Sequence, residues 1–116
     1  MKPPHLSPFV EAGSLVFLSG QLAMGPDRQI VHDGVGEQTS QVLANIDSLL
    51  GRLGLGRTDV IKTTVWLRSG ADFVAFNDAY AEFFGDHRPA RSTVYSQLAL
   101  PAAAVEIEAV ALRKGA

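Results

Sequence analysis

The 116-residue chain contains no cysteine, which excludes disulfides, thiolate nucleophiles and cysteine-ligated metal sites. Its three histidines, His5, His32 and His87, lack the spacing of metal ligands, and we expect all three at the surface. The residues therefore predict no metal site.

A strong charge of either sign is also missing. The formal net charge is −2, and no run of five like charges occurs. Nucleic-acid-binding proteins usually present a basic face that neutralises phosphates, so we expect no nucleic-acid partner, and a ribonuclease is the weakest interpretation.

Long hydrophobic runs are absent as well. The longest nearly continuous run spans residues 98–105, is interrupted by Pro101, and is too short to cross a bilayer. The first residues, MKPPHLSPFV, lack the hydrophobic segment of a secretory signal. We therefore expect a soluble, cytoplasmic protein with no membrane partner.

What the chain does contain fits one folded domain over residues 1–116. Hydrophobic residues make up 47% of the chain and charged residues 19%, which is an ordinary globular mixture. The hydrophobic periodicity predicts two helices and four long strands, with an optional further strand between the first long strand and the first helix. The helices are expected at residues 34–53 and 71–84, and the strands at residues 15–22, 60–67, 91–97 and 105–112.

The strands carry apolar side chains on both faces. In the first long strand, Leu15 and Phe17 point one way. Val16 and Leu18 point the other way. Two helices cannot cover both faces of such a sheet, so one apolar face is left without cover from its own chain. The simplest solution is burial against other copies, and the pattern therefore predicts an oligomer.

Arg91 stands at the head of a predicted strand, where chains usually enter a core. Its planar fork of donors could bind a carboxylate in a bidentate manner. Alternatively, it forms a structural ion pair, or its stem lies along the surface with the charge in water. The residues alone leave these interpretations open.

Glu106 and Glu108 alternate with apolar residues in AVEIEAV, so both point from one face of the last strand. One interpretation is a half-exposed strand with a wet side. However, Val110 and Leu112 continue the same face as apolar residues. A carboxylate beside a buried apolar patch can have a raised pKa, which suits proton transfer.

We expect the last two strands to pair as a hairpin with a loop near residues 98–99. That pairing would place Arg91 roughly opposite Glu106, as partners in a site or in a salt bridge. Gly20, in the strand-end motif SGQ, permits close approach by a ligand or another backbone, or marks a β-bulge. Asn77 would by default be a solvated helix residue.

Four motifs together resemble the RidA family, which is also called YjgF/YER057c/UK114. They are SGQ after a strand, FNDAYAEFF on a helix, PARSTV and VEIEAVA, in the family's order and spacing. The resemblance covers residues 7–112. It implies a chorismate-mutase-like α+β fold, in which two helices pack on one face of a mixed sheet. It also implies a homotrimer around the other face, with clefts between subunits.

The resemblance further implies an activity. It is the hydrolysis of reactive enamine and imine intermediates, such as 2-aminoacrylate and 2-iminopropanoate, to 2-keto acids and ammonia, with no cofactor or metal. Arg91 matches the arginine that binds the substrate carboxylate, and Glu106 matches the glutamate that orients or activates water. The other matched positions line the cleft and are Ser19, Gly20, Asn77 and Thr93, the last at a position where many members have cysteine.

One position departs from the family pattern. Phe9, which we also expect to line the cleft, stands where the best-studied members have tyrosine, so a hydroxyl is missing there. Members also act in aminomuconate deamination and pyrimidine breakdown, or are described as holdases or translation inhibitors. The alternative to an enzyme is thus a trimeric module that binds small carboxylates or unfolded chains. The joint presence of Arg91 and Glu106 favours the enzyme.

Overall fold

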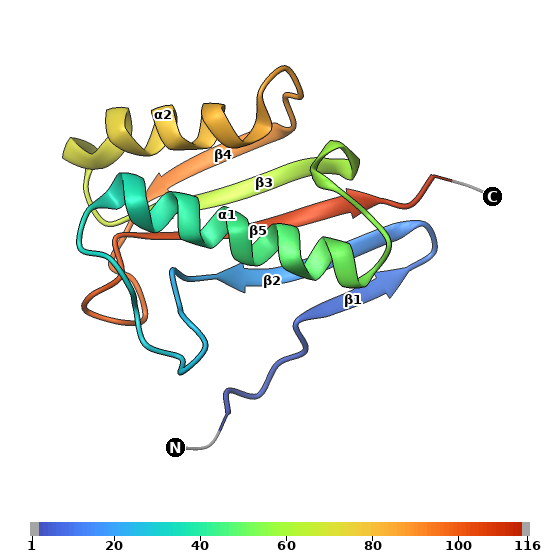
Figure 1. The fold of residues 1–116 in the computed structure, drawn as a ribbon, viewed down its shortest axis with the longest axis horizontal. Coiled ribbons are helices and arrows are strands. Elements are labelled where there is room, and N and C mark those ends of the chain that lie inside the picture. Colours follow the sequence, from blue (N-terminus) through green and yellow to red (C-terminus); the bar gives the residue numbers. More distant parts are fainter. Residues whose placement is uncertain (1–2, 115–116) are drawn as a thin grey trace.

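Five strands form one mixed sheet in the spatial order β1-β2-β5-β3-β4, in a computed structural model that describes residues 3–114 (Figure 1). The strands are β1 (Phe9–Ala12), β2 (Leu15–Gln21), β3 (Val60–Leu67), β4 (Ala90–Tyr95) and β5 (Val105–Leu112). The helices are α1 (Val35–Arg52) and α2 (Phe73–Phe84), with short 3₁₀ turns at Arg57–Asp59 and Gly70–Asp72. The predicted α+β class is confirmed. The optional strand was expected after the first long strand, but the additional short strand, β1, precedes it.

The order of the strands differs from the expected hairpin at the end of the chain. β5 lies between β2 and β3 and is antiparallel to both, so the predicted pairing of β4 with β5 is wrong. β4 instead pairs in parallel with β3, and α2 supplies the long crossover that a parallel pair needs. The central place buries Val105, Ile107 and Ala109 of β5 almost completely, which an edge strand could not achieve.

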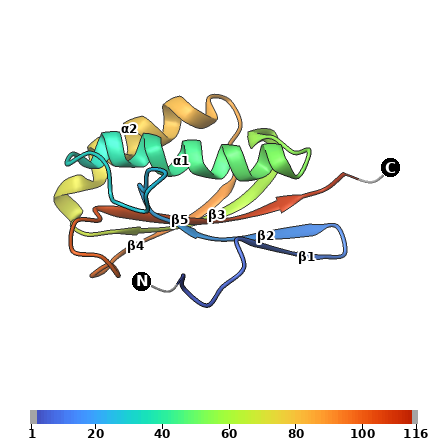
Figure 2. The same ribbon diagram turned by 60° about the horizontal axis from the view of Figure 1, so that its bottom comes forward.

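Both helices lie on the same face of the sheet (Figure 2). Their apolar stripes, which recur at helical spacing, point at the strands. The fully or nearly buried members are Val42, Leu43, Ile46, Leu49 and Leu50 of α1, and Phe76, Tyr80 and Phe84 of α2. Burial of one large apolar side chain stabilises a fold by roughly 1.5–3 kcal/mol. The many side chains buried between the helices and the sheet therefore make a large contribution to the stability of the fold.

The opposite face of the sheet carries no helix (Figure 2). Apolar side chains nevertheless meet across it, since Phe17 of β2 lies opposite Val110 of β5. Val94 of β4 likewise lies opposite Trp66 of β3. Phe17 and Val94 are each 43% exposed. The uncovered apolar face expected from the strand pattern is therefore present.

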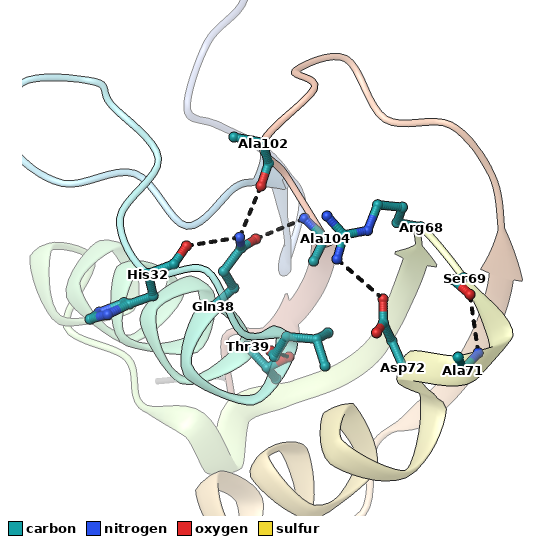
Figure 3. A network of polar contacts seen from close by, with 10 residues as sticks. His32, Gln38, Thr39, Arg68, Ser69, Ala71, Asp72, Ala102 and Ala104 are labelled. Atoms are coloured by element: carbon teal, nitrogen blue, oxygen red, sulfur yellow. Dashed lines mark hydrogen bonds and ion pairs between the residues drawn. The ribbon is translucent and has the colours of Figure 1, made fainter.

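A buried glutamine ties the loop before β5 to the helix layer (Figure 3). The Gln38 side chain on α1 is completely buried. Its Nε2 donates to the carbonyl oxygens of His32, at 3.1 Å, and Ala102, at 3.0 Å. Its Oε1 accepts from the backbone N–H of Ala104 at 2.8 Å. These bonds fix the approach to β5, and with it the start of the strand that carries Glu106.

Candidate active site

Arg91, the second residue of β4, points to the helix-covered side of the sheet. It pairs with Thr63 of β3, which is buried beneath α2. The Arg91 Nη1 donates to Asn77 Oδ1 at 3.0 Å. Its guanidinium carbon lies 4.8 Å from the ring centroid of Tyr80 and 5.2 Å from that of Phe76. The charge is thus held by one amide and by the faces of aromatic rings, which attract cations.

Tyr80 completes the support of Arg91 from α2. Its hydroxyl shares a hydrogen bond with Thr63 Oγ1, with the two oxygens 2.7 Å apart. Burial raises the pKa of Tyr80, while the Thr63 hydrogen bond and the Arg91 charge oppose that rise. The phenol therefore stays neutral at physiological pH and acts as a fixed wall.

A pocket of about 430 Å³ opens beside Arg91. Its lining residues come from α2 and from the turn that leads into β4. They are Asn77, Tyr80, Ala81, Phe84, Gly85, His87, Arg88, Pro89 and Arg91. Among these described lining residues there is no carboxylate, so the pocket presents positive charge and apolar rings to a ligand.

Glu106 lies on the other face of the sheet, opposite Trp66. It is half-buried and passes so close to Gly20 that a Cβ at that position would overlap the carboxylate. Burial raises the pKa of Glu106, and the neighbouring charge of Glu108 raises it further. The predicted common face of the two glutamates is confirmed by the alternating burial along β5. A carboxylate with a raised pKa is suited to accept and return a proton near neutral pH.

Of the two features considered for the SGQ motif, the strand irregularity is present, whereas the close approach at Gly20 is made by a side chain and not by another backbone. The β2–β5 register shifts between Leu18 and Gln21, which is a β-bulge or similar irregularity. At the same place Gly20 lets Glu106 approach closely. The Ser19 hydroxyl donates to the carbonyl of Ser7 at 2.6 Å, which ties the bulge to the segment before β1.

Arg91 and Glu106 lie on opposite faces of the sheet. Side chains alternate along β3, so Thr63, the partner of Arg91, points to the helices, and Trp66, the partner of Glu106, points away. Two strand spacings and three residues along the strand separate the two Cα atoms, which is roughly 14 Å. One chain therefore cannot bring this guanidinium and this carboxylate together, either on one substrate or in one salt bridge.

The remaining predicted residues divide between the two faces. Thr93 is half-buried, and alternation along β4 places it on the same side as Arg91. Phe9 pairs with Leu18 and packs against the hydrophobic core. A single chain thus contains an Arg91 group, made of Arg91, Asn77, Tyr80 and Thr93, and a Glu106 group, made of Glu106, Gly20 and Ser19.

Three residues with a place in this geometry were missed or misjudged from sequence. Arg88 lines the pocket, and its position three residues before Arg91 in HRPAR was the available signal. Tyr80 was not singled out from the sequence, although its hydroxyl is hydrogen-bonded to Thr63. His87 was expected at the surface, but it is half-buried and its Nε2 lies 2.6 Å from the carbonyl oxygen of Val60.

Two other kinds of feature are absent from residues 3–114. No group of three or more His, Asp or Glu side chains in this range is arranged to hold a metal ion. No helix in the described part of the chain is long and apolar enough to span a membrane.

Comparison with known proteins gives relatives over nearly the whole chain. A family model described as Endoribonuclease L-PSP matches residues 3–113. The chain is 40% identical over 116 residues to the 2-iminobutanoate/2-iminopropanoate deaminase of Capra hircus, covering 96% of this chain and 84% of that protein. It is 39% identical over 113 residues to the 3-aminoacrylate deaminase RutC of Acinetobacter baylyi, covering 94% and 90%.

Solved structures agree with the sequence relatives. A member of the YjgF protein family from Neisseria meningitidis superposes with a TM-score of 0.87 at 31% identity, covering 99% of this chain and 92% of that one. The two-helix mixed sheet defines the class as a small YjgF-type α+β protein. The chain belongs to the RidA (YjgF/YER057c/UK114) family. Its relatives in this family include proteins named as imine and aminoacrylate deaminases.

Proposed function

We propose that this protein hydrolyses 2-imino acids, and enamines that tautomerise to them, to 2-keto acids and ammonia. The reaction would occur in clefts of a homotrimer, where the Arg91 group of one copy faces the Glu106 group of the next. The observation that carries this proposal is the division of the two groups between opposite faces. If the β4 edge of one copy packs against the helix-free face of the next, the Arg91 group and the Glu106 group can meet. The same arrangement would cover the apolar face around Phe17 and Val94.

Each group has a distinct task in this reaction. Arg91 binds the substrate carboxylate through two parallel charge-assisted hydrogen bonds. Glu106 takes a proton from a water molecule, whose oxygen attacks the imine carbon. That proton passes to the imine nitrogen and gives a carbinolamine. The carbinolamine hydroxyl then gives up its proton to the same nitrogen by way of Glu106, the carbon–nitrogen bond breaks, and ammonia leaves as the carbonyl forms. One water is consumed for each imine, and no electrons leave or enter.

A coupled assay tests the activity. An amino-acid oxidase generates imines from several amino acids, semicarbazide traps those that persist, and removal by the protein appears as lost semicarbazone. We expect less semicarbazone to form with the wild-type protein than with Arg91→Ala at equal concentration, because the wild-type protein removes the imine faster. Light scattering checks the assembly, because a monomer mass at micromolar concentration would contradict the shared cleft.

The Arg91 pocket also supports a second candidate, a module that binds small carboxylates without turning them over. The pocket is already formed within one chain, and binding needs no water-activating glutamate. A protein that binds 2-ketobutyrate with micromolar affinity and removes no imine in the coupled assay would establish this candidate over the hydrolase. A holdase would need neither group, so binding of unfolded chains that survives Arg91→Ala and Glu106→Gln would identify it.

A further inference from the structure

The pocket beside Arg91 holds more positive charge than one substrate carboxylate requires. Arg88 lines the same pocket, and no carboxylate among the described residues lines it. Neither arginine forms a salt bridge within residues 3–114, where the recorded pairs involve other residues. His87, the third basic residue of the lining, has its Nε2 engaged at the carbonyl of Val60.

We propose that this pocket selects dianionic substrates, namely 2-imino acids whose side chain ends in a second carboxylate. Arg91 would bind the carboxylate next to the imine carbon, and Arg88 the carboxylate of the side chain. The proposal rests on the hydrolase function above for its chemistry, and on the two arginines for its choice of substrate.

The placement of the two arginines suits such a ligand. They are three positions apart in the chain, so their Cα atoms lie within about 10 Å of each other, and two long side chains can converge on one small molecule. Pro89 between them fixes its own φ and stiffens the turn. Arg91 is half-buried and held by Asn77, whereas Arg88 is exposed at the rim. The first can therefore orient the reacting end while the second receives the side chain.

Charge alone also favours a dianion here. Two guanidiniums without a carboxylate partner repel each other, and a ligand with two negative charges relieves that repulsion more fully than one with a single charge. The chain as a whole is slightly acidic, with a net charge of −2, so the positive pocket is a local feature. Its field should attract anions and weaken with added salt.

The selectivity of turnover and of binding tests the proposal with the same proteins. Turnover is compared on imines generated from glutamate or aspartate and on those from alanine or leucine. Binding is measured by calorimetry with 2-oxoglutarate, 2-ketobutyrate and inorganic phosphate. The variants are Arg88→Ala and Arg88→Glu, and Arg52→Ala, an exposed arginine at the end of α1, serves as the matched control.

We expect the wild-type protein to turn over the dicarboxylic imines roughly tenfold better than the monocarboxylic ones, and to bind 2-oxoglutarate roughly tenfold more tightly than 2-ketobutyrate. Tenfold is the scale of one added charge-assisted contact. Arg88→Ala should remove most of that ratio, Arg88→Glu should invert it, and Arg52→Ala should keep it. Light scattering and melting curves verify that each variant is folded. Since Arg88 is exposed, Arg88→Lys provides a further, milder variant, which should keep part of the preference for dicarboxylic ligands.

The outcomes separate this proposal from the hydrolase function. If monocarboxylic and dicarboxylic imines are removed equally well, or if the Arg88 variants keep the wild-type ratio, the dianion proposal is overturned while the hydrolase stands. Phosphate binding as tight as that of 2-oxoglutarate would also overturn it, as the pocket would then be a general anion site. If no imine is removed but 2-oxoglutarate binding depends on Arg88, the dianion pocket is supported and the hydrolase fails.

Discussion

The two polar groups of this chain differ in how complete they are. The Arg91 group is built within one chain, where an amide and two aromatic rings hold the guanidinium over a formed pocket. The Glu106 group lies on an uncovered apolar face, and its carboxylate has a raised pKa and rests against a glycine. The first is equipped to bind an anion, whereas the second holds a proton acceptor that lies outside the Arg91 pocket. Under the proposed function, anion binding would be a property of the single chain, and the chemistry would be a property of the assembly.

Mixing of subunits tests most directly whether the Arg91 group of one copy acts together with the Glu106 group of another. Arg91→Ala should nearly abolish turnover, and Arg91→Lys should recover little, because a point charge does not reproduce the fork. Glu106→Gln should also be severely impaired. When the Arg91→Ala and Glu106→Gln proteins are unfolded together, refolded and assayed, about one cleft in four should combine the two intact groups in a randomly assembled ring.

Recovery of activity in the mixture is therefore expected, and each variant refolded alone is the control. A mixture of trimers as inactive as its components would contradict clefts shared between copies. Wild-type turnover by a folded, trimeric Arg91→Ala protein would contradict the mechanism itself.

The second prediction separates the roles of the two groups. Glu106→Gln should lower turnover by a factor on the order of 10²–10⁴, the usual contribution of general acid–base catalysis. It should leave the affinity for 2-ketobutyrate nearly unchanged, because Arg91 alone binds that carboxylate. Calorimetry and the coupled assay on one preparation decide the matter. A parallel loss of keto-acid affinity and melting temperature would instead assign Glu106 a structural role.

The strand pattern predicted some of this geometry and missed the rest for identifiable reasons. Alternation in AVEIEAV placed Glu106 and Glu108 on one face correctly, because that property is local to one strand. The pairing of β4 with β3 was missed, since local patterns do not state which strands become neighbours. The Arg91–Asn77 hydrogen bond depends on that pairing and on the position of α2, so the residues alone could not establish it. The family motifs indicated both Arg91 and Asn77, because a motif matched to a family reflects the complete fold of its members.

The third prediction concerns the glycine against which Glu106 rests. Gly20→Ala should push the carboxylate aside, because an added Cβ would also lie 3.1 Å from its Cδ. We expect turnover to fall roughly tenfold, less than after loss of the carboxylate, since the flexible end of the side chain can shift. Gly51→Ala on α1, where nothing lies near an added Cβ, is the matched control. Equal activities of the two variants would remove Gly20 from the site.

The fourth prediction is a shift in the pH profile. Glu106 acts as a base only when ionised, so a pKa raised above the ordinary value of 4.5 moves the acidic limb of kcat/KM upward in pH. Glu108→Gln removes one of the two causes, and the limb should then move to lower pH. On β3 the nearest cation along this face is Lys62, opposite Val110, and it is unchanged in this variant.

Stability should respond to the same groups with a defined sign. Since folding raises the pKa of Glu106, its protonated form is favoured in the folded state, and that contribution is lost as pH rises through the folded pKa. The melting temperature of Glu106→Gln should therefore gain on that of the wild type as the pH rises above about 4.5. An acidic limb of kcat/KM that is identical in Glu108→Gln and wild type would show that Glu106 does not govern it.

The smallest expected effect lies at Phe9, which has two possible roles: lining the substrate cleft or packing against the hydrophobic core. As part of a cleft wall, a phenyl ring without a hydroxyl should favour apolar over small polar side chains among imines whose side chains are uncharged. Phe9→Tyr should shift that preference toward the small polar ones by only a few fold. In the chain, however, Phe9 pairs with Leu18 and packs against the core, which is the side away from Glu106. The variant is compared on alanine-, leucine- and phenylalanine-derived imines, with melting temperature measured alongside. A changed order of preference at constant stability places the ring in the cleft, whereas an unchanged order with a lower melting temperature shows that the phenyl ring serves packing.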